Sequence, residues 1–165
     1  MSGGLFRVMR LDEAHDRSSF SSGSEALDRY FHRQVTQDIR RRVAACFIAM
    51  ASHSVIAGYY TLSAASAPLM DLPEKNRKKL PRYPSVPVVR LGRLAVAKTF
   101  QGQGLGGALL ADALIRVKES DIAAYAMIAD AKNDSAKAFY QHHGFIPLSD
   151  SPFTLFLPLA SIKAL

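Results

Sequence analysis

The residues whose types and spacing could do chemistry lie at a junction past the middle of the chain. A strand-like run from Leu91 to Val96 leads into a glycine-rich turn, and apolar side chains then recur from Leu105 to Val117. Their period of about 3.6 residues predicts a helix. Backbone N–H groups at a helix start lack internal partners, and the helix dipole adds positive charge there. The junction from Gln101 to Ala108 therefore predicts a cradle for a phosphate or a pyrophosphate.

Two other interpretations of the glycine turn are a dinucleotide site and a plain turn. Gly102, Gly104 and Gly107 spell the G-x-G-x-x-G pattern. That pattern is expected near the start of a βαβ unit, with an acidic residue about 20 positions later. Here the turn lies late in the chain, and the next acidic residues, Glu119 and Asp121, come too early. A Walker loop is excluded because the turn lacks a final Gly-Lys-Ser/Thr. A turn that merely needs glycine remains an alternative.

A different signature accounts for this turn together with a second segment. The pattern Gln101-x-x-Gly104-x-Gly106 resembles the Q/R-x-x-G-x-G/A signature of the GNAT acetyltransferase superfamily. Further along, the chain resembles the family's N-x-x-A-x-x-F-Y-x-x-x-G-F segment, reading Asn133-Asp134-Ser135-Ala136-Lys137-Ala138-Phe139-Tyr140-Gln141-His142-His143-Gly144-Phe145. The two segments follow the family's order and spacing over residues 89 to 146, which makes the pair far more specific than either alone.

The resemblance implies that the chain uses acetyl-CoA, whose pyrophosphate the family holds with this turn. The implied cofactor-binding residues are Leu94, Ala95, Val96, Gln101, Gly102, Gln103, Gly104, Leu105, Gly106, Gly107, Asn133 and Phe139. Backbone groups of Leu94 and Val96 could pair with the pantetheine amides, as a strand adds to a sheet edge. The alternatives are a helix cap for Asn133 and a core position for Phe139.

The resemblance also assigns a general acid, Tyr140, for which the alternative is a packing aromatic. A phenol suits a departing thiolate, because the reference pKa of tyrosine is about 10 and that of a thiol about 8.5. No general base stands out. We interpret Asp130 as a solvated carboxylate, and His142 with His143 as a solvated helix end and not a metal site. This favours an acceptor amine that is already reactive, such as an α-amine with a pKa of about 8.

The elements that must position these residues follow from the sequence pattern. Strands are expected at 5–11, 43–50, 55–65, 88–96, 123–129, 145–147 and 153–157, with a hairpin around 52–54. Helices are expected from Ser24 as N-cap to about 38–42, at 72–80 capped by Asp71, at 105–117, and from 133 or 134 to Gly144. The order βαββαβαβαββ indicates an α/β (α+β) fold. The resemblance implies a single GNAT domain over residues 1–165, with a mixed central sheet flanked by helices on both faces.

Length and composition limit the class of protein. A chain of 165 residues with 48% hydrophobic residues can form one domain with a real core. No apolar run approaches the roughly 20 residues that span a bilayer, and no signal peptide is evident. Cys46 is the single cysteine, so no intrachain disulfide is expected. We expect a buried, unreactive thiol in a cytoplasmic protein without a membrane partner.

The charge indicates a polyanionic partner. Lysines and arginines number 21 against 14 acidic residues, which gives a net charge of +7. The basic residues cluster at 40–42 and 75–82, and Arg90 and Arg93 flank the predicted cofactor strand. Such patches attract polyanions and make their binding sensitive to salt. We therefore expect contacts to the acceptor substrate from Arg90, Arg93, Lys78 and Lys79.

A closer resemblance, to the GNAT toxins of bacterial toxin–antitoxin modules, lies in residues 19–23, 27–31, 58–62 and 88–96. It implies acetylation of the α-amine of aminoacyl-tRNA, which blocks translation, and it implies a ribbon-helix-helix antitoxin and a homodimer. One departure is Ser22, where the family often has cysteine. The alternatives are a GNAT enzyme acting on a small amine or a protein N-terminus, a CoA-binding protein without turnover, and a DNA-binding module.

Overall fold

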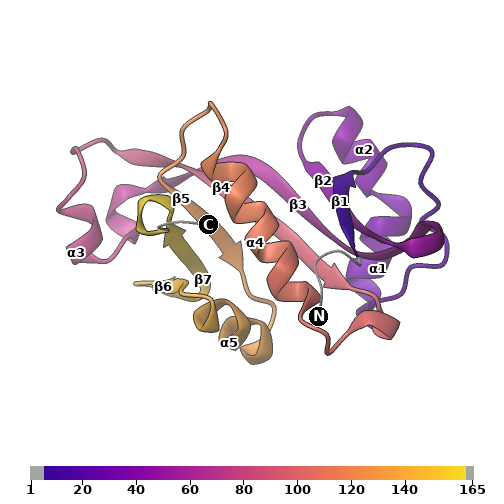
Figure 1. Cartoon of the computed structure of the whole chain (residues 1–165). Coiled ribbons are helices and arrows are strands. Elements are labelled where there is room, and N and C mark those ends of the chain that lie inside the picture. The colour runs from indigo at the N-terminus through magenta and orange to yellow at the C-terminus, as the bar shows by residue number, and fades with distance from the viewer. Residues whose placement is uncertain (1–5, 163–165) are drawn as a thin grey trace. The chain divides into compact units, whose positions relative to one another are not determined.

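The structure, a computed structural model, describes residues 6–162. In this range the strands are β1 (Arg7–Arg10), β2 (Ala45–Ala51), β3 (Val55–Pro68), β4 (Ser85–Val96), β5 (Ala126–Asp130), β6 (Ile146–Leu148) and β7 (Ser151–Pro158). The helices are α1 (Glu25–Arg33), α2 (Val35–Arg40), α3 (Glu74–Arg77), α4 (Leu105–Lys118) and α5 (Asp134–His142). The described strands form one sheet in the order β1-β2-β3-β4-β5-β7-β6 (Figure 1). The β4–β5 pair is parallel and the β1–β2, β2–β3, β5–β7 and β6–β7 pairs are antiparallel, so the sheet is mixed, as predicted.

The described chain divides into two compact units. The first holds residues 6–63 and 92–113, and the second holds residues 64–91 and 114–162. Strands β3 and β4 and helix α4 each contribute residues to both units. A single domain over residues 1–165 stays a prediction.

In the first unit, α1 and α2 cover one face of the strands. Their apolar residues pack with residues of β2 and β3 in one core cluster that includes Tyr30, Phe31, Val35, Cys46, Ile48, Ile56 and Tyr59. Successive residues of a strand point to opposite faces, and Gly58 accordingly lies against α4. A Cβ added to Gly58 would meet Leu109 Cδ1 at 2.8 Å. Helices therefore lie on both faces of this part of the sheet, as predicted.

In the second unit, a separate core cluster holds the strands together. Its buried members are Ala67, Leu72, Val86, Val88, Ala126, Ile128, Leu148 and Phe156. The start of β5 is set by a backbone bond in which Tyr125 N donates to Pro87 O at 2.7 Å. Helix α5 is followed by Gly144 at φ +93°, the left-handed residue that the sequence predicts there.

Two predicted helices differ in the structure. The predicted helix 72–80 is only the four-residue α3, and Asp71 does not cap it, because Asp71 ends a 3₁₀ turn and Pro73 precedes the helix. The helix that begins after Ser24 is interrupted at Gln34, which separates α1 from α2. The Arg17 guanidinium donates to the carbonyls of Phe31 and His32, and it thus satisfies the end of α1.

Strand boundaries shift by a few residues while the order of elements is as predicted. Strand β3 runs on to Pro68 and β5 begins at Ala126, three residues later than expected. The hairpin around residues 52–54 is confirmed, with β2 and β3 joined through a 3₁₀ turn. Among the helices within residues 6–162, none is long and apolar enough to cross a membrane.

Candidate functional site

The end of β4 carries the chain into the glycine turn. The pairing of β4 with β5 covers Val88 to Leu91, and the residues from 92 to Val96 continue past that ladder. Just after β4, the backbone is hydrogen-bonded to β3, because Ala97 N donates to Ala57 O at 2.8 Å. The end of the ladder at Leu91 is compatible with the predicted pairing of Leu94 and Val96 to an extended ligand.

The glycine turn has a backbone that only glycine adopts readily. Gly102 lies at φ +78° and Gly104 at φ +82°, both in the left-handed region. A Cβ added to either residue would meet no atom of the described chain within 4 Å. The glycines are thus required by the backbone conformation, and the space beside them is open.

Helix α4 begins at this turn without a side-chain cap. Ala108 N donates to Gly104 O at 3.1 Å, which makes Gly104 the N-cap residue. By contrast, α1 and α5 are capped by side chains, with Ser24 accepting from Leu27 N and Asn133 accepting from Ala136 N. The N–H groups at residues 105–107 have no intrahelical partner, and a glycine cap has no oxygen to offer them. An anion can take that place.

The predicted ligand residue Gln101 serves the turn itself. Its Nε2 donates to Ser22 O at 2.7 Å and to Val96 O at 2.9 Å. Gln103 Nε2 lies 3.5 Å from Thr99 O. The side chain of Leu105 is buried, so only its backbone could face a ligand. In this structure both glutamine side chains contact the chain around the turn, which leaves the backbone amides of the turn as the groups that a ligand could meet.

The two arginines expected to contact the substrate are engaged within the chain. The Arg93 guanidinium lies over the Tyr30 ring, 3.5 Å from its centroid. Arg90 forms an ion pair with Asp130. Lys78 and Lys79 are exposed on the segment that follows α3. Both arginines are thus engaged within the chain, whereas no ion pair is seen for the two lysines within residues 6–162, and the substrate contacts of all four stay a prediction.

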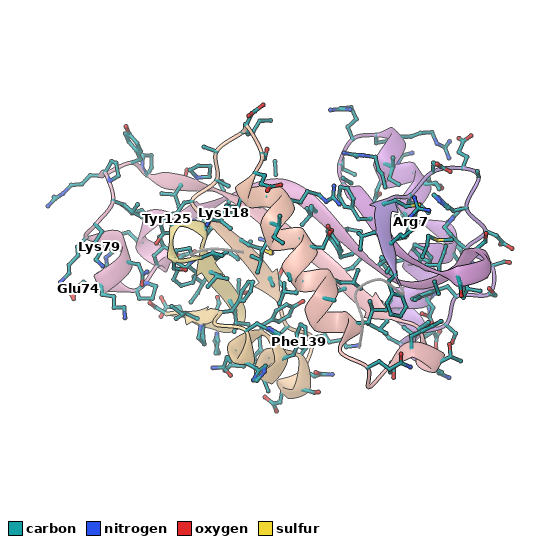
Figure 2. The ribbon with its side chains drawn as sticks, in the orientation of Figure 1. Arg7, Glu74, Lys79, Lys118, Tyr125 and Phe139 are labelled. Atoms are coloured by element: carbon teal, nitrogen blue, oxygen red, sulfur yellow. The ribbon has the colours of Figure 1, made fainter. Side chains whose placement is uncertain are left out.

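Helix α5 presents the second group of predicted residues. Asn133 is exposed and its Oδ1 accepts from Ala136 N at 2.9 Å, so the cap interpretation is confirmed while its NH₂ stays available. Phe139 is half-buried, and its ring lies 5.3 Å from Tyr140 and 4.8 Å from His143 between centroids (Figure 2).

Tyr140 differs from the other buried tyrosines. Tyr30, Tyr59 and Tyr60 each donate a hydroxyl hydrogen bond, to Asp38, Leu27 O and Asp112 respectively. Tyr140 is 6% exposed, yet its hydroxyl has no hydrogen-bond partner among residues 6–162. Burial, and secondarily the charge of Asp130, raise the pKa of Tyr140 to about 12. The phenol is thus protonated at neutral pH and free to donate.

Asp130 is not a free general base in the structure. Asp130 accepts from Arg90 and, at 2.9 Å, from Thr154 Oγ1, so it is paired and not merely solvated as expected. His142 and His143 are both exposed, and burial, followed by the neighbouring His142, lowers the pKa of His143. Within the described residues no group of three side chains could hold a metal ion.

A cavity at α1 was not predicted from the sequence. It has a volume of about 530 Å³ and lies in the first unit, lined by Ser21, Gly23, Asp28, Arg29, His32 and Lys98, among others. The spacing of Arg29, His32 and Arg33 on one helix face was the only local signal for it. Lys98 N donates to Ser21 O at 2.8 Å. Both residues line the cavity, and Lys98 precedes the cradle by three positions, so the hydrogen bond joins the cavity wall to the segment that leads into the cradle.

Comparison with known proteins decides the family. The model of the acetyltransferase (GNAT) domain matches residues 19–154. The chain belongs to the GNAT acetyltransferase family. This GNAT chain is 36% identical to the Mycobacterium tuberculosis protein named tRNA-acetylating toxin, over 94% of this chain and 93% of that protein.

Two solved structures are similar to this GNAT chain over nearly its whole length. One is AtaT complexed with acetyl-methionyl-tRNAfMet, at a TM-score of 0.88 and 32% identity, covering 94% of this chain and 96% of that chain. The other is a tyrosine-to-phenylalanine variant of AtaT bound to the C-terminus of the antitoxin AtaR and acetyl-CoA. It has a TM-score of 0.79 and 27% identity, and 94% of each chain is covered.

The residues of this GNAT chain fit a coenzyme A diphosphate. The N-cap is glycine, no side chain within residues 6–162 is seen to accept from the N–H groups that follow, and the space beside Gly102 and Gly104 is open. A diphosphate supplies the oxygens that such a helix start lacks.

Proposed function

We propose that the protein transfers the acetyl group of acetyl-CoA to the α-amine of an aminoacyl-tRNA, as the toxin of a toxin–antitoxin pair. The observation that carries this proposal is the 36% identity, over nearly the full length of both chains, to a protein named tRNA-acetylating toxin. The basic surface and the paired state of Asp130 support it. An α-amine with a pKa of about 8 is partly neutral at physiological pH and needs little help from a base.

Acetyl-CoA would supply an activated thioester, and the chain would position it. The backbone N–H groups after Gly104 would hold the diphosphate, and the end of β4 would pair with the pantetheine arm. The amine would form a bond to the acetyl carbon as the carbon–sulfur bond breaks. The Tyr140 hydroxyl would give its proton to the leaving thiolate, the amine would release one proton to solvent, and solvent would return one to the Tyr140 phenolate.

We also propose the partners that follow from this function. They are a ribbon-helix-helix antitoxin that blocks the toxin, and a second copy of the chain in a homodimer. The substrate places the activity with the translation machinery, in the cytoplasm. Size-exclusion chromatography with light scattering tests the homodimer directly, and a monomer at micromolar concentration would contradict it.

The replacement Tyr140→Phe tests the chemistry. It removes a hydroxyl that has no hydrogen-bond partner within residues 6–162, so we expect unchanged acetyl-CoA binding and a fall in kcat of about 100-fold to 10,000-fold. The matched control is Tyr59→Phe, which removes another buried hydroxyl, one that donates to Leu27 O at 2.7 Å. It should cost about 1–3 kcal/mol of stability and leave kcat nearly unchanged.

Radiolabelled acetyl-CoA tests the acceptor. It is offered in parallel to charged tRNA, deacylated tRNA and free amino acids. We expect label on charged tRNA alone. Label on free amino acids alone would reject the tRNA assignment, and an unimpaired Tyr140→Phe variant would reject Tyr140 as the acid.

A further inference from the structure

The segment between β3 and β4, residues 69–84, carries a large share of the chain's charge. It has five basic residues, Lys75, Arg77, Lys78, Lys79 and Arg82, and two acidic ones, Asp71 and Glu74. Its net charge is therefore +3, out of +7 for the whole chain. Figure 2 shows Lys79 and Glu74 on this segment, at the left of the view.

The segment is an anchored platform within the second unit. Leu69 N donates to Pro84 O at 3.0 Å, which closes its base. Leu72 is 1% exposed, and the Arg77 guanidinium donates to Leu72 O at 2.9 Å. Leu69 and Leu80 pack against the core cluster of the unit. These contacts fix the backbone and use one of the five basic side chains internally.

The other four basic side chains face solvent. Lys75, Lys78, Lys79 and Arg82 are exposed, and the structure gives none of them an ion pair with any residue from 6 to 162. Cations held on an anchored backbone without carboxylate partners are available to phosphates, and each phosphate they neutralise releases counterions.

An aromatic ring stands among these cations. Tyr83 is 63% exposed and has no ring contact with another described residue. It follows Arg82 and precedes Pro84, and Pro81 comes two positions earlier, so the backbone on both sides is restricted. Proteins that bind single-stranded nucleic acid combine exposed aromatic rings with cations, so that bases stack on the rings and phosphates contact the cations.

We propose that residues 69–84 bind an unpaired stretch of the RNA substrate, with a base stacked on Tyr83 and phosphates on Lys78, Lys79 and Arg82. This inference rests on the proposed function and adds to it the surface that holds the RNA. A duplex offers no free base face to the ring, and an acidic peptide would use the cations but has no need of the ring.

Binding to a fluorescent single-stranded RNA oligonucleotide, without acetyl-CoA, tests the surface directly. Tyr83→Ala should weaken binding on the order of tenfold, and Tyr83→Phe should stay within about twofold because the stacking ring remains. Lys78→Gln with Lys79→Gln should lower the slope of log K against log salt by about 1.4, since two phosphate contacts are lost. The matched control, Arg7→Gln with Arg10→Gln, removes the same charge from exposed positions of β1, outside both basic clusters, and should leave the slope nearly unchanged.

Three results would overturn the inference. They are unchanged binding by Tyr83→Ala, a duplex of the same sequence bound as tightly as the single strand, or a polyglutamate peptide whose binding depends equally on Tyr83. Acetylation of charged tRNA separates this inference from the proposed function. We expect Tyr83→Ala to raise KM for charged tRNA while KM for acetyl-CoA is unchanged. An unchanged KM for charged tRNA would reject this surface and leave the function intact. Failure of the wild-type chain to acetylate charged tRNA would reject the function, while the oligonucleotide measurements would still decide the surface.

Discussion

The replacement Gly104→Ala perturbs the cradle by a single methyl group. Gly104 lies at φ +82°, where an L-residue other than glycine costs about 1–2 kcal/mol. The new Cβ would meet no atom within 4 Å, so no clash within the chain adds to this cost. For a domain of this size we expect the melting temperature to fall by about 2–8 °C.

Gly104→Ala should reduce the free energy of acetyl-CoA binding by more than it reduces the free energy of unfolding. The added methyl group occupies the open space beside the N–H groups that would meet the diphosphate. Each hydrogen bond to a charged group is worth about 1.5–3 kcal/mol, so losing one weakens binding on the order of 10- to 100-fold. Isothermal titration calorimetry measures the affinity, and thermal unfolding measures the stability of the same samples.

Gly144→Ala is the matched control for backbone strain. Gly144 lies at φ +93°, and a Cβ there would meet Leu157 Cδ1 at 3.7 Å, an ordinary contact. It should lower the melting temperature by a similar amount and leave acetyl-CoA affinity unchanged. Equal losses of affinity in the two variants, or full affinity in Gly104→Ala, would refute the assignment of the glycine turn as the diphosphate site.

Three further predictions concern stability and reactivity. Ser24→Ala removes the hydroxyl that accepts from Leu27 N at a long 3.4 Å, so urea unfolding should show that the free energy of unfolding falls by about 0.5–1 kcal/mol. A larger fall would contradict the weak hydrogen bond that this distance indicates. Cys46 is 1% exposed and burial raises its pKa to about 12, so a thiol reagent should label it only after unfolding, and rapid labelling of the native chain would contradict its burial. Burial raises the pKa of Tyr140 to about 12, above the value of about 10 in the unfolded chain. The contribution of Tyr140 to the free energy of unfolding is therefore fully present below about pH 10 and is lost as the pH rises toward 12. Tyr140→Phe should therefore make the free energy of unfolding less dependent on pH above about pH 10, and parallel curves for variant and wild type would rule this out.

Local sequence chemistry predicted much of the fold and the framework of the candidate site. Glycines that require positive φ marked the turn before α4, and cap residues marked both ends of α5, where Asn133 and Gly144 have the predicted roles. These signals work because the residue and the backbone it serves are neighbours in the sequence.

Contacts between distant residues could not be predicted in this way. Arg17 satisfies the end of α1 from 14 and 15 positions away, and nothing near Gln34 marks a break. Asp130 is paired with Arg90, 40 positions earlier, which removes it as a free base. The unpartnered hydroxyl of Tyr140 is likewise a property of the folded surroundings, so only the resemblance to a family could single it out beforehand.

Gln101 makes the glycine turn before α4 depend on a stretch close to the start of the chain. Its amide joins the carbonyls of Ser22 and Val96, and Ser22 is 79 positions away along the backbone. A chain shortened past Ser22 would keep every glycine of the turn and still lose one of the two points to which the turn is fastened. Removing the N-terminal region should therefore also disturb the turn that we propose as the coenzyme site.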